Sequence, residues 1–517
     1  MNKFIILGTV FETIREGKLM ADFGVAANKT TLSHGVKWSF GIGQMAEGIK
    51  NSSFSAFLLF YYNQVLGLPA ESAGLAIAVS LIFDAVTDPM IGTISDRWRS
   101  PLGRRHPFMY ASAVPLAVSL YFLFAPASFA INGGDAALFA WMLTFTVLTR
   151  GAMTLYHVPH LALGAELSED YDERTTLVAI RQILSVSGYL IVYGLGFGVF
   201  FAPTPEFENG QLNSAAYPPF AMILALISCV TVLISGWGTR SRIPYLPKPP
   251  AEADKMRPYD ILIEGIATLK NRSFRWLMVS YIIIITTFGL GVASQLYIFT
   301  FFWELARFQI LTVMLMGPAG SVLGYMVSTR LFARLDKRNA MIVGGVFWML
   351  LHALPVILFL IGIAPAKGTW AVAVMLSVIY LILGAAFAQV VVGVSTTMAD
   401  IADEYELEVG RRQEGVLFAA VSFAGKCMGA LGSLLAGFML TLIAWPTGEA
   451  IKTSADIPAE TILSLGIMSG PVAAMLAIPG FICLMGYKLN RAKVAEIQRQ
   501  LRERTATPMP VPALTDE

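Results

Sequence analysis

The chain has 517 residues, of which 56% are hydrophobic and 14% charged, and its mean hydropathy is +0.63. Soluble globular chains have roughly 45–50% apolar and about 25% charged residues, so this composition excludes them and indicates a membrane protein. The net charge of +2 provides no basic field for binding nucleic acid. The three cysteines lie in apolar runs without metal-binding spacing, so we expect neither a disulfide scaffold nor a zinc site, and no cofactor.

Twelve stretches of mainly apolar residues follow one another, and each reaches the roughly 20 residues that a helix needs to span a bilayer. They begin near Trp38, Ser72, Pro107, Ala136, Thr176, Pro218, Phe274, Phe308, Ala340, Trp370, Gly415 and Thr461. The longest polar segment, Thr239 to Ser273, is rich in proline and separates the sixth stretch from the seventh. We therefore predict an all-α integral membrane protein with twelve transmembrane helices in two six-helix bundles.

These stretches divide the chain into five predicted parts. They are an N-terminal extension (1–36), a first bundle (37–239), a linker (240–273), a second bundle (274–488) and a tail (489–517). The apolar run Phe4 to Phe11 is followed by charged residues rather than by a small-residue cleavage site, so we do not expect a secretory signal.

Basic residues concentrate in alternate loops. They follow the second and eighth helices and fill the central linker, while the opposite loops hold few. By the positive-inside rule, both termini and the linker are cytoplasmic in a multi-pass protein of the cell's inner membrane. The fourth and tenth helices both end in acidic and then basic residues, which suggests a duplicated unit of the kind that builds alternating-access transporters.

The second helix carries Asp84 and Asp88 one turn apart, so their carboxylates share one face about 5–6 Å apart. An aspartate inside a bilayer costs roughly 2.5–3.5 kcal/mol unless it meets water, a cation, a basic partner or a proton. Two like charges this close favour binding of a cation such as sodium, or of a proton. Pro89 also frees the Ala85 carbonyl as a further ligand for a hard cation. The alternative is a capped or snorkelling pair near the helix end.

Lys426 lies about a dozen residues into the eleventh helix, too deep for its side chain to reach either interface easily. It needs an anionic partner, and Asp84 or Asp88 across the interface between the bundles is the most economical choice. A lysine that competes with a cation for these carboxylates couples occupancy to conformation. The alternative is a lysine bonded to backbone carbonyls in a kinked region.

Further polar side chains on the first, fourth and fifth helices are candidates for a binding cavity. His157 suits proton movement if it lies beside the aspartates, and a core histidine is the alternative. Glu47 and Lys50 either line a wet cavity or neutralise each other. Arg181 shares its helix with tyrosines and is a candidate for binding sugar hydroxyls, unless its side chain merely reaches the interface.

The loop between the second and third helices, Asp96 to Pro107, combines a turn glycine with four arginines. We predict that it latches to carboxylates at the end of the fourth helix and closes the cytoplasmic side in one state. The alternative is a plain topology signal. The predicted gating residues, including those at the matching end of the tenth helix, are Asp96, Arg97, Arg104, Arg105, Glu166, Asp170, Asp403 and Arg411.

Four blocks of sequence resemble one family of transporters. They are Asp84 to Gly92, the Asp96 to Pro107 loop, the stretch from Ala162 to Arg181, and the stretch from Ala399 to Lys426. In these blocks the chain resembles the glycoside-pentoside-hexuronide:cation symporters, the melibiose permease group of the major facilitator superfamily. The resemblance covers all twelve helices and excludes the first 35 or so residues and the tail.

The resemblance implies a role for five residues of this chain. Asp84 and Asp88 correspond to the family's cation-binding pair, Lys426 to the lysine that links cation and sugar, and Arg181 to an arginine that touches sugar. Ser422, one turn before Lys426, is a lesser candidate for the cavity.

The chain departs from the family pattern at three positions. His157 replaces an aspartate of the fourth helix, Leu161 replaces a tryptophan, and Gly48, next to Glu47, replaces the sugar-binding aspartate of the first helix. In the family, the residues at these positions bind sugar hydroxyls and help to shape the cation site. The departures therefore weaken the case for a galactoside substrate and for sodium coupling, and they favour coupling to a proton.

We therefore expect a secondary active symporter, working as a monomer in the lipid bilayer, that couples inward movement of a proton or sodium ion to uptake of a glycoside or related sugar. Its cavity is expected to use Glu47, Lys50, His157, Arg181, Ser422 and Lys426. Two alternatives are a transporter of an amphiphilic cargo such as a lysolipid and a non-transporting sensor. Because the chain lacks motifs such as HExxH, GxSxG and a phosphate-cradling loop, we do not expect an enzyme.

Overall fold

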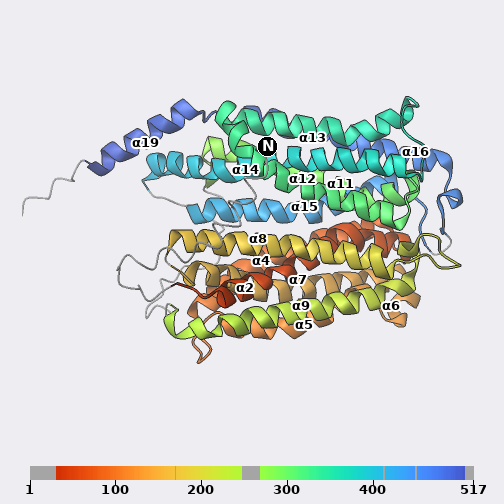
Figure 1. The fold of residues 1–517 in the computed structure, drawn as a ribbon, viewed down its shortest axis with the longest axis horizontal. Coiled ribbons are helices and arrows are strands. Elements are labelled where there is room, and N and C mark those ends of the chain that lie inside the picture. The colour runs from red at the N-terminus through yellow and green to blue at the C-terminus, as the bar shows by residue number, and fades with distance from the viewer. Residues whose placement is uncertain (1–30, 169, 247–267, 411–413, 449–450, 507–517) are drawn as a thin grey trace, which may run out of the picture.

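A computed structural model describes residues 31–168, 170–246, 268–410, 414–448 and 451–506. The described residues form helices and connecting turns, with no β-strand among them. Figure 1 shows the helices of the first half, coloured red to yellow-green, in one layer, and those of the second half, green to blue, in another. The long helices of both layers lie roughly parallel to one another, so most of them extend from one end of the molecule to the other.

The first layer contains six spans. They are the broken first span α2 (His34–Ile42), α3 (Gln44–Ser52), η1 (Ser53–Leu58) and η2 (Tyr61–Val65), then α4 (Ala70–Arg97), α5 (His106–Phe124), α7 (Gly134–Glu166), α8 (Tyr171–Leu195) with η3 (Gly196–Phe200), and α9 (Tyr217–Thr239). Short connecting helices are α6 (Ser128–Asn132), η4 (Gly210–Leu212), η5 (Ser214–Ala216) and η6 (Arg240–Tyr245).

The second layer contains the other six spans. They are α11 (Arg272–Tyr297) with η7 (Ile298–Phe302), α12 (Arg307–Arg334), α13 (Lys337–Leu360), α14 (Trp370–Val409), α15 (Glu414–Leu442), and the segmented last span α16 (Ala459–Ile467), η9 (Met468–Val472), α17 (Ala473–Met475) and α18 (Ile478–Met485). The short helix η8 (Ser454–Asp456) precedes the last span, and α19 (Arg491–Ala506) follows it.

The predicted all-α membrane fold is confirmed. Among the described residues, eleven helical segments are long and apolar enough to cross a membrane. The first predicted span is also helical, but a turn at Gly43 and two π-helical stretches divide it into pieces shorter than a membrane span. Residues 1–30 of the predicted extension and 247–267 of the predicted linker lie outside the described residues, and the tail contains the helix α19.

Similar ion pairs lie in both bundles at the end where α2 begins and α19 lies, here called the terminal end (Figure 1). In the first bundle, Arg105 Nη2 at the start of α5 lies 2.7 Å from Glu166 Oε1 at the end of α7. In the second, Lys337 Nζ at the start of α13 lies 2.6 Å from Asp400 Oδ2 near the end of α14. The third and fourth spans of each half are therefore tied in the same way.

The bundles meet tightly at the opposite end, here called the distal end. Tyr297 Oη donates to Asn63 Oδ1 at 2.8 Å, and Trp445 Nε1 donates to Gln64 Oε1 at 2.7 Å. Tyr297 also packs edge-on against Phe60, with ring centroids 4.9 Å apart. Buried aromatic packing combined with these two hydrogen bonds excludes water. The structure is therefore closed at its distal end.

Two glycines allow this closure. A Cβ built at Gly437 of α15 would lie 2.3 Å from the Ala70 carbonyl oxygen of α4, and one at Gly74 would lie 2.9 Å from the Leu434 Cα and the Ser433 carbonyl oxygen. Contacts this short cannot be accommodated without moving the helices apart. Small residues thus set the spacing of the bundles at the distal end.

Gly437→Val is expected to weaken distal closure, because its side chain forces α4 and α15 apart. The measurement is the reaction rate of Ser55→Cys, a cavity-lining position, with a membrane-impermeant maleimide added from the distal side, in a background without the native cysteines. We expect faster labelling in Gly437→Val. The neighbouring substitution Phe438→Val, at a side chain that is 56% exposed, is the control; equal rates in both variants would contradict the closure.

Candidate functional site

The two aspartates of α4 lie in a network of buried and half-buried charges. Arg150 Nη1 of α7 lies 2.6 Å from Asp84 Oδ2. Lys426 of α15 forms an ion pair with Asp88, and its Nζ lies 3.6 Å from Asp84 Oδ2. Thr154 Oγ1 of α7 donates to Asp88 Oδ1 at 2.8 Å. Two carboxylates therefore face two basic groups, and Lys426 has the anionic partners that the sequence predicts.

The two halves of this network differ in their burial. The Arg150 and Asp84 side chains are 7% and 4% exposed, whereas those of Lys426 and Asp88 are each 30% exposed. A fully buried ion pair is costly to separate because each partner leaves an uncompensated charge. The Arg150–Asp84 pair is thus the fixed half, and the Lys426–Asp88 pair, which joins the second bundle to the first, is the half that an ion from solution can reach.

A cavity of ≈ 240 Å³ adjoins this network. Five of the predicted substrate-binding residues line it: Glu47, Lys50, His157, Ser422 and Lys426. Arg150 lines it as well, together with Asn51 and Tyr189. The cavity draws these side chains from α3, α7 and α8 of the first bundle and α15 of the second, so it lies between the bundles.

Glu47 and Lys50 do not neutralise each other. Glu47 accepts a hydrogen bond from Gln44, and its Oε2 lies 3.4 Å from His157 Nδ1. Lys50 Nζ has no carboxylate within 4 Å among the described side chains, although it lies in the field of Arg150 and Glu47. The carboxylate partner of His157 is therefore Glu47 rather than Asp84 or Asp88, and Lys50 presents an unpaired ammonium to the cavity.

The structure explains why glycine occupies position 48. Gly48 lies where α3 crosses α8, and a Cβ there would lie 2.1 Å from the Ser185 carbonyl oxygen. The backbone contact leaves no room for the aspartate that relatives are expected to carry at this position.

Arg181 of α8 is not among the residues that line the cavity, but its Nε is buried without a hydrogen-bond partner in the described part of the chain.

The predicted gating residues gather at the terminal end. Arg104 and Arg105 both contact Glu166 Oε1, at 2.9 and 2.7 Å, and Arg105 also lies 2.5 Å from Asp96. The latch between the loop and α7 therefore forms inside the first bundle.

The other predicted gating residues have different surroundings. Asp170 Oδ1 accepts a hydrogen bond from the Glu173 amide at 2.8 Å and so caps α8. Asp403 Oδ2 accepts from Gln498 Nε2 of α19 at 3.0 Å. Arg97 has a noncovalent partner within the protein. Arg411 lies outside the described residues.

Glu166→Gln is expected to lower the free energy of unfolding by about 1.5–3 kcal/mol, the range for hydrogen bonds to charged groups, because it removes the charge that Arg104 and the buried Arg105 share. Asp170→Asn is the matched control. Asparagine caps helices as well as aspartate does, so its stability should stay within about 0.5 kcal/mol of the parent. Thermal unfolding of the purified variants measures both; equal losses would show that Asp170 belongs to the latch.

With this geometry in place, comparison with known proteins decides the family. The sequence matches the MFS/sugar transport protein family over residues 39–491. This chain belongs to that family. The match covers all twelve spans, and it confirms the family resemblance inferred from the four sequence blocks.

Individual relatives match over most of their length. The chain is 22% identical to the inner membrane symporter YicJ of Escherichia coli (strain K12) over 467 residues, which cover 90% of this chain and 94% of YicJ. It is 25% identical to the isoprimeverose transporter of Lactiplantibacillus pentosus, covering 78% of this chain and 79% of that protein. Among solved structures, the xylose transporter XylE from E. coli superposes with a TM-score of 0.58 at 12% identity, covering 90% and 99% of the two chains. The last likeness concerns the fold.

Proposed function

We propose that this chain is a proton-coupled sugar symporter that works by alternating access around the cavity between its two bundles. The observation that carries the proposal is the Lys426–Asp88 ion pair, which joins the bundles beside that cavity and keeps 30% of each side chain exposed. Such a pair is a contact between the bundles that a bound ion can break. Family membership and the two relatives, a symporter and an isoprimeverose transporter, support a sugar as substrate.

The geometry favours a proton over sodium. A metal cation of this kind needs several oxygen ligands, and Arg150 already occupies Asp84 at 2.6 Å. A proton needs only one carboxylate, and Asp88 supplies it. When a proton binds Asp88, Lys426 loses the closer of its two carboxylate partners, and the other, Asp84, is already paired with Arg150. The ammonium is then free to move toward the cavity that it lines. Loss of the proton to the other side restores the pair.

Three further features belong to this proposal. We propose from the basic loops that the terminal end is cytoplasmic, that the distal closure faces outward, and that uptake proceeds toward the terminal end. We propose the inner membrane as the location and the monomer as the working unit, with no catalytic role. Alternating access then consists of opening the distal contacts and closing the terminal end as the bundles rock about the fixed site.

Uptake into proteoliposomes tests the proposal. The purified protein is reconstituted and given labelled xylose, glucose, galactose and glucuronic acid in turn, each as the free sugar, the methyl glycoside and the 4-nitrophenyl glycoside. Each compound is tested with an imposed proton gradient, an imposed sodium gradient, or neither. We expect at least one of these compounds to accumulate above its outside concentration with the proton gradient and not with sodium alone. Accumulation driven by sodium alone would overturn the proposed ion, and failure of every sugar and glycoside to accumulate under either gradient would overturn the proposed function.

A further inference from the structure

A second cavity adjoins the charged one. It has a volume of ≈ 200 Å³, and its walls come mainly from the second bundle. Ser55, Tyr189 and Met428 line both cavities, so the two are neighbours in one chamber. Neither volume alone reaches the roughly 300–1,000 Å³ of typical small-molecule sites, whereas the two together do.

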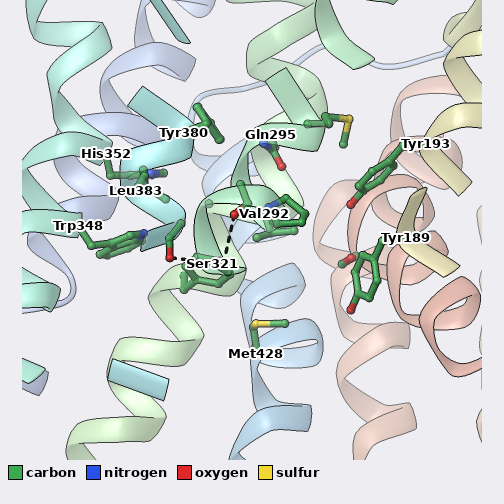
Figure 2. Close-up of a pocket in the computed structure, with 17 residues that line it drawn as sticks. Tyr189, Tyr193, Val292, Gln295, Ser321, Trp348, His352, Tyr380, Leu383 and Met428 are labelled. Atoms are coloured by element: carbon green, nitrogen blue, oxygen red, sulfur yellow. Dashed lines mark hydrogen bonds between the residues drawn. The ribbon is translucent and has the colours of Figure 1, made fainter. Parts of the chain in front are cut away.

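The second cavity differs from the first in its chemistry, and we call it the aromatic cavity. Figure 2 shows Trp348, His352 and Tyr380 on one side and Tyr189 and Tyr193 on the other. Phe288 adds a further ring, 5.8 Å from that of Trp348. No Asp, Glu, Lys or Arg lines this cavity, in contrast to the charged one.

The polar groups of the aromatic cavity are largely bonded within the protein. His352 Nε2 hydrogen-bonds to the Ser469 carbonyl oxygen at 2.9 Å, and Ser321 Oγ donates to the Gly317 carbonyl oxygen at 3.2 Å. Sugar hydroxyls buried here would lose their hydrogen bonds to water and find few free hydrogen-bonding groups of the protein to replace them, which is unfavourable. A flat, apolar group gains contact with the rings instead.

Trp348 supplies one free donor. Its side chain is 1% exposed, and its Nε1 is buried with no hydrogen-bond partner among the described residues. A buried indole N–H normally finds an acceptor. Because Trp348 lines the cavity, as Figure 2 shows, a bound molecule that carries an acceptor atom on its apolar part can supply the missing partner.

We propose that the substrate is a glycoside with an aromatic aglycone rather than a free monosaccharide. The sugar ring lies in the charged cavity, where Glu47, Lys50 and His157 face its hydroxyls. The aglycone lies between the tyrosines of α8 and Trp348 of α13, and an acceptor atom on it receives the indole N–H. This inference rests on the proposed function and narrows its substrate class.

Pairs of glycosides that share one sugar test the proposal. Binding of methyl and 4-nitrophenyl β-glycosides of xylose, glucose, galactose and glucuronic acid to the purified full-length protein is measured by calorimetry. For the sugar that binds, the 4-nitrophenyl glycoside is expected to bind about tenfold or more tightly than the methyl glycoside, because ring burial adds favourable contact. Trp348→Leu should reduce this ratio severalfold, and Trp348→Phe, which keeps a ring and removes the donor, should reduce it less.

A neighbouring residue provides the control. Phe347, the residue before Trp348 in α13, is 50% exposed and does not line the aromatic cavity, so Phe347→Leu should leave the ratio unchanged. Phe288→Leu offers a second change within the aromatic cavity should Trp348 variants fold poorly. A ratio near one in the parent protein, or a Trp348→Leu ratio equal to that of the parent, would overturn the aglycone assignment.

The outcomes separate this inference from the proposed function. Binding of methyl and aryl glycosides with equal affinity, together with proton-driven uptake, rejects the aromatic aglycone and leaves the symporter. Absence of binding for both kinds of glycoside rejects both. Binding of a lysophosphatidylcholine in place of either glycoside also rejects the inference, because the occupant of the aromatic cavity is then a lipid chain.

Discussion

Asp88→Asn is expected to abolish gradient-driven accumulation of sugar while sugar exchange across the membrane continues. Asparagine has no charge to lose, so it can neither accept the coupling proton nor hold Lys426 as an ion pair. We expect the accumulation ratio to fall by at least about tenfold, the equivalent of ~1.4 kcal/mol in coupling free energy. Proton-driven uptake and exchange in proteoliposomes loaded with unlabelled sugar measure the two activities separately.

Val86→Ala is the control for this result. Val86 lies on the same helix two residues away, but its side chain is 55% exposed on the outer surface. Its substitution should change neither activity. If Asp88→Asn accumulates sugar to the same ratio as the parent, the coupling proton binds elsewhere, and the role proposed for Asp88 is wrong.

Arg150→Met is expected to cost about 3–5 kcal/mol of folding stability, as does removal of one partner from other buried ion pairs. Asp84, which is buried in the parent, would then have no basic partner on that side. Lys426 Nζ, already 3.6 Å from Asp84 Oδ2, would then be drawn away from Asp88. We therefore expect weaker coupling as well as a lower unfolding temperature.

The double variant Arg150→Met with Asp84→Asn separates charge from packing. It removes both members of the pair, so most of the lost stability should return, since a neutral pair has no unpaired charge to bury. Thermal unfolding of both single variants and the double variant gives the interaction energy. A single Arg150→Met variant as stable as the parent would show that Asp84 does not depend on this arginine.

Much of the fold could be predicted because membrane spans leave a strong local signal. Twelve apolar runs of sufficient length fix twelve helices, wherever their partners lie. The signal is weaker where a span is broken. Gly43 and the π-helical stretches Ser53–Leu58 and Tyr61–Val65 interrupt the first span, and nothing in its apolar composition indicates them. The helix α19 was missed, although Val494, Ile497 and Leu501 recur at helical spacing.

The site was predictable where chemistry demands a partner. A lysine deep in a membrane span requires an anion, so Lys426 led to the aspartates of α4. The pairing of Arg150 with Asp84 was not predicted, because the two residues lie 66 positions apart in the sequence. The distal closure was not predicted for the same reason. Gln64 and Trp445 are 381 residues apart, and only the packing of the two bundles brings them together.

In the proposed mechanism, the charge on Asp88 decides which end of the molecule is open. Distances between spin labels test it most directly, with one pair at Glu206 and Ala366 of the distal end and another at Arg99 and Arg334 of the terminal end, in a protein without native cysteines. We predict that acidification redistributes both distances in the parent and that Asp88→Asn holds one distribution at every pH. Equal responses to pH in the parent and in Asp88→Asn would contradict the claim.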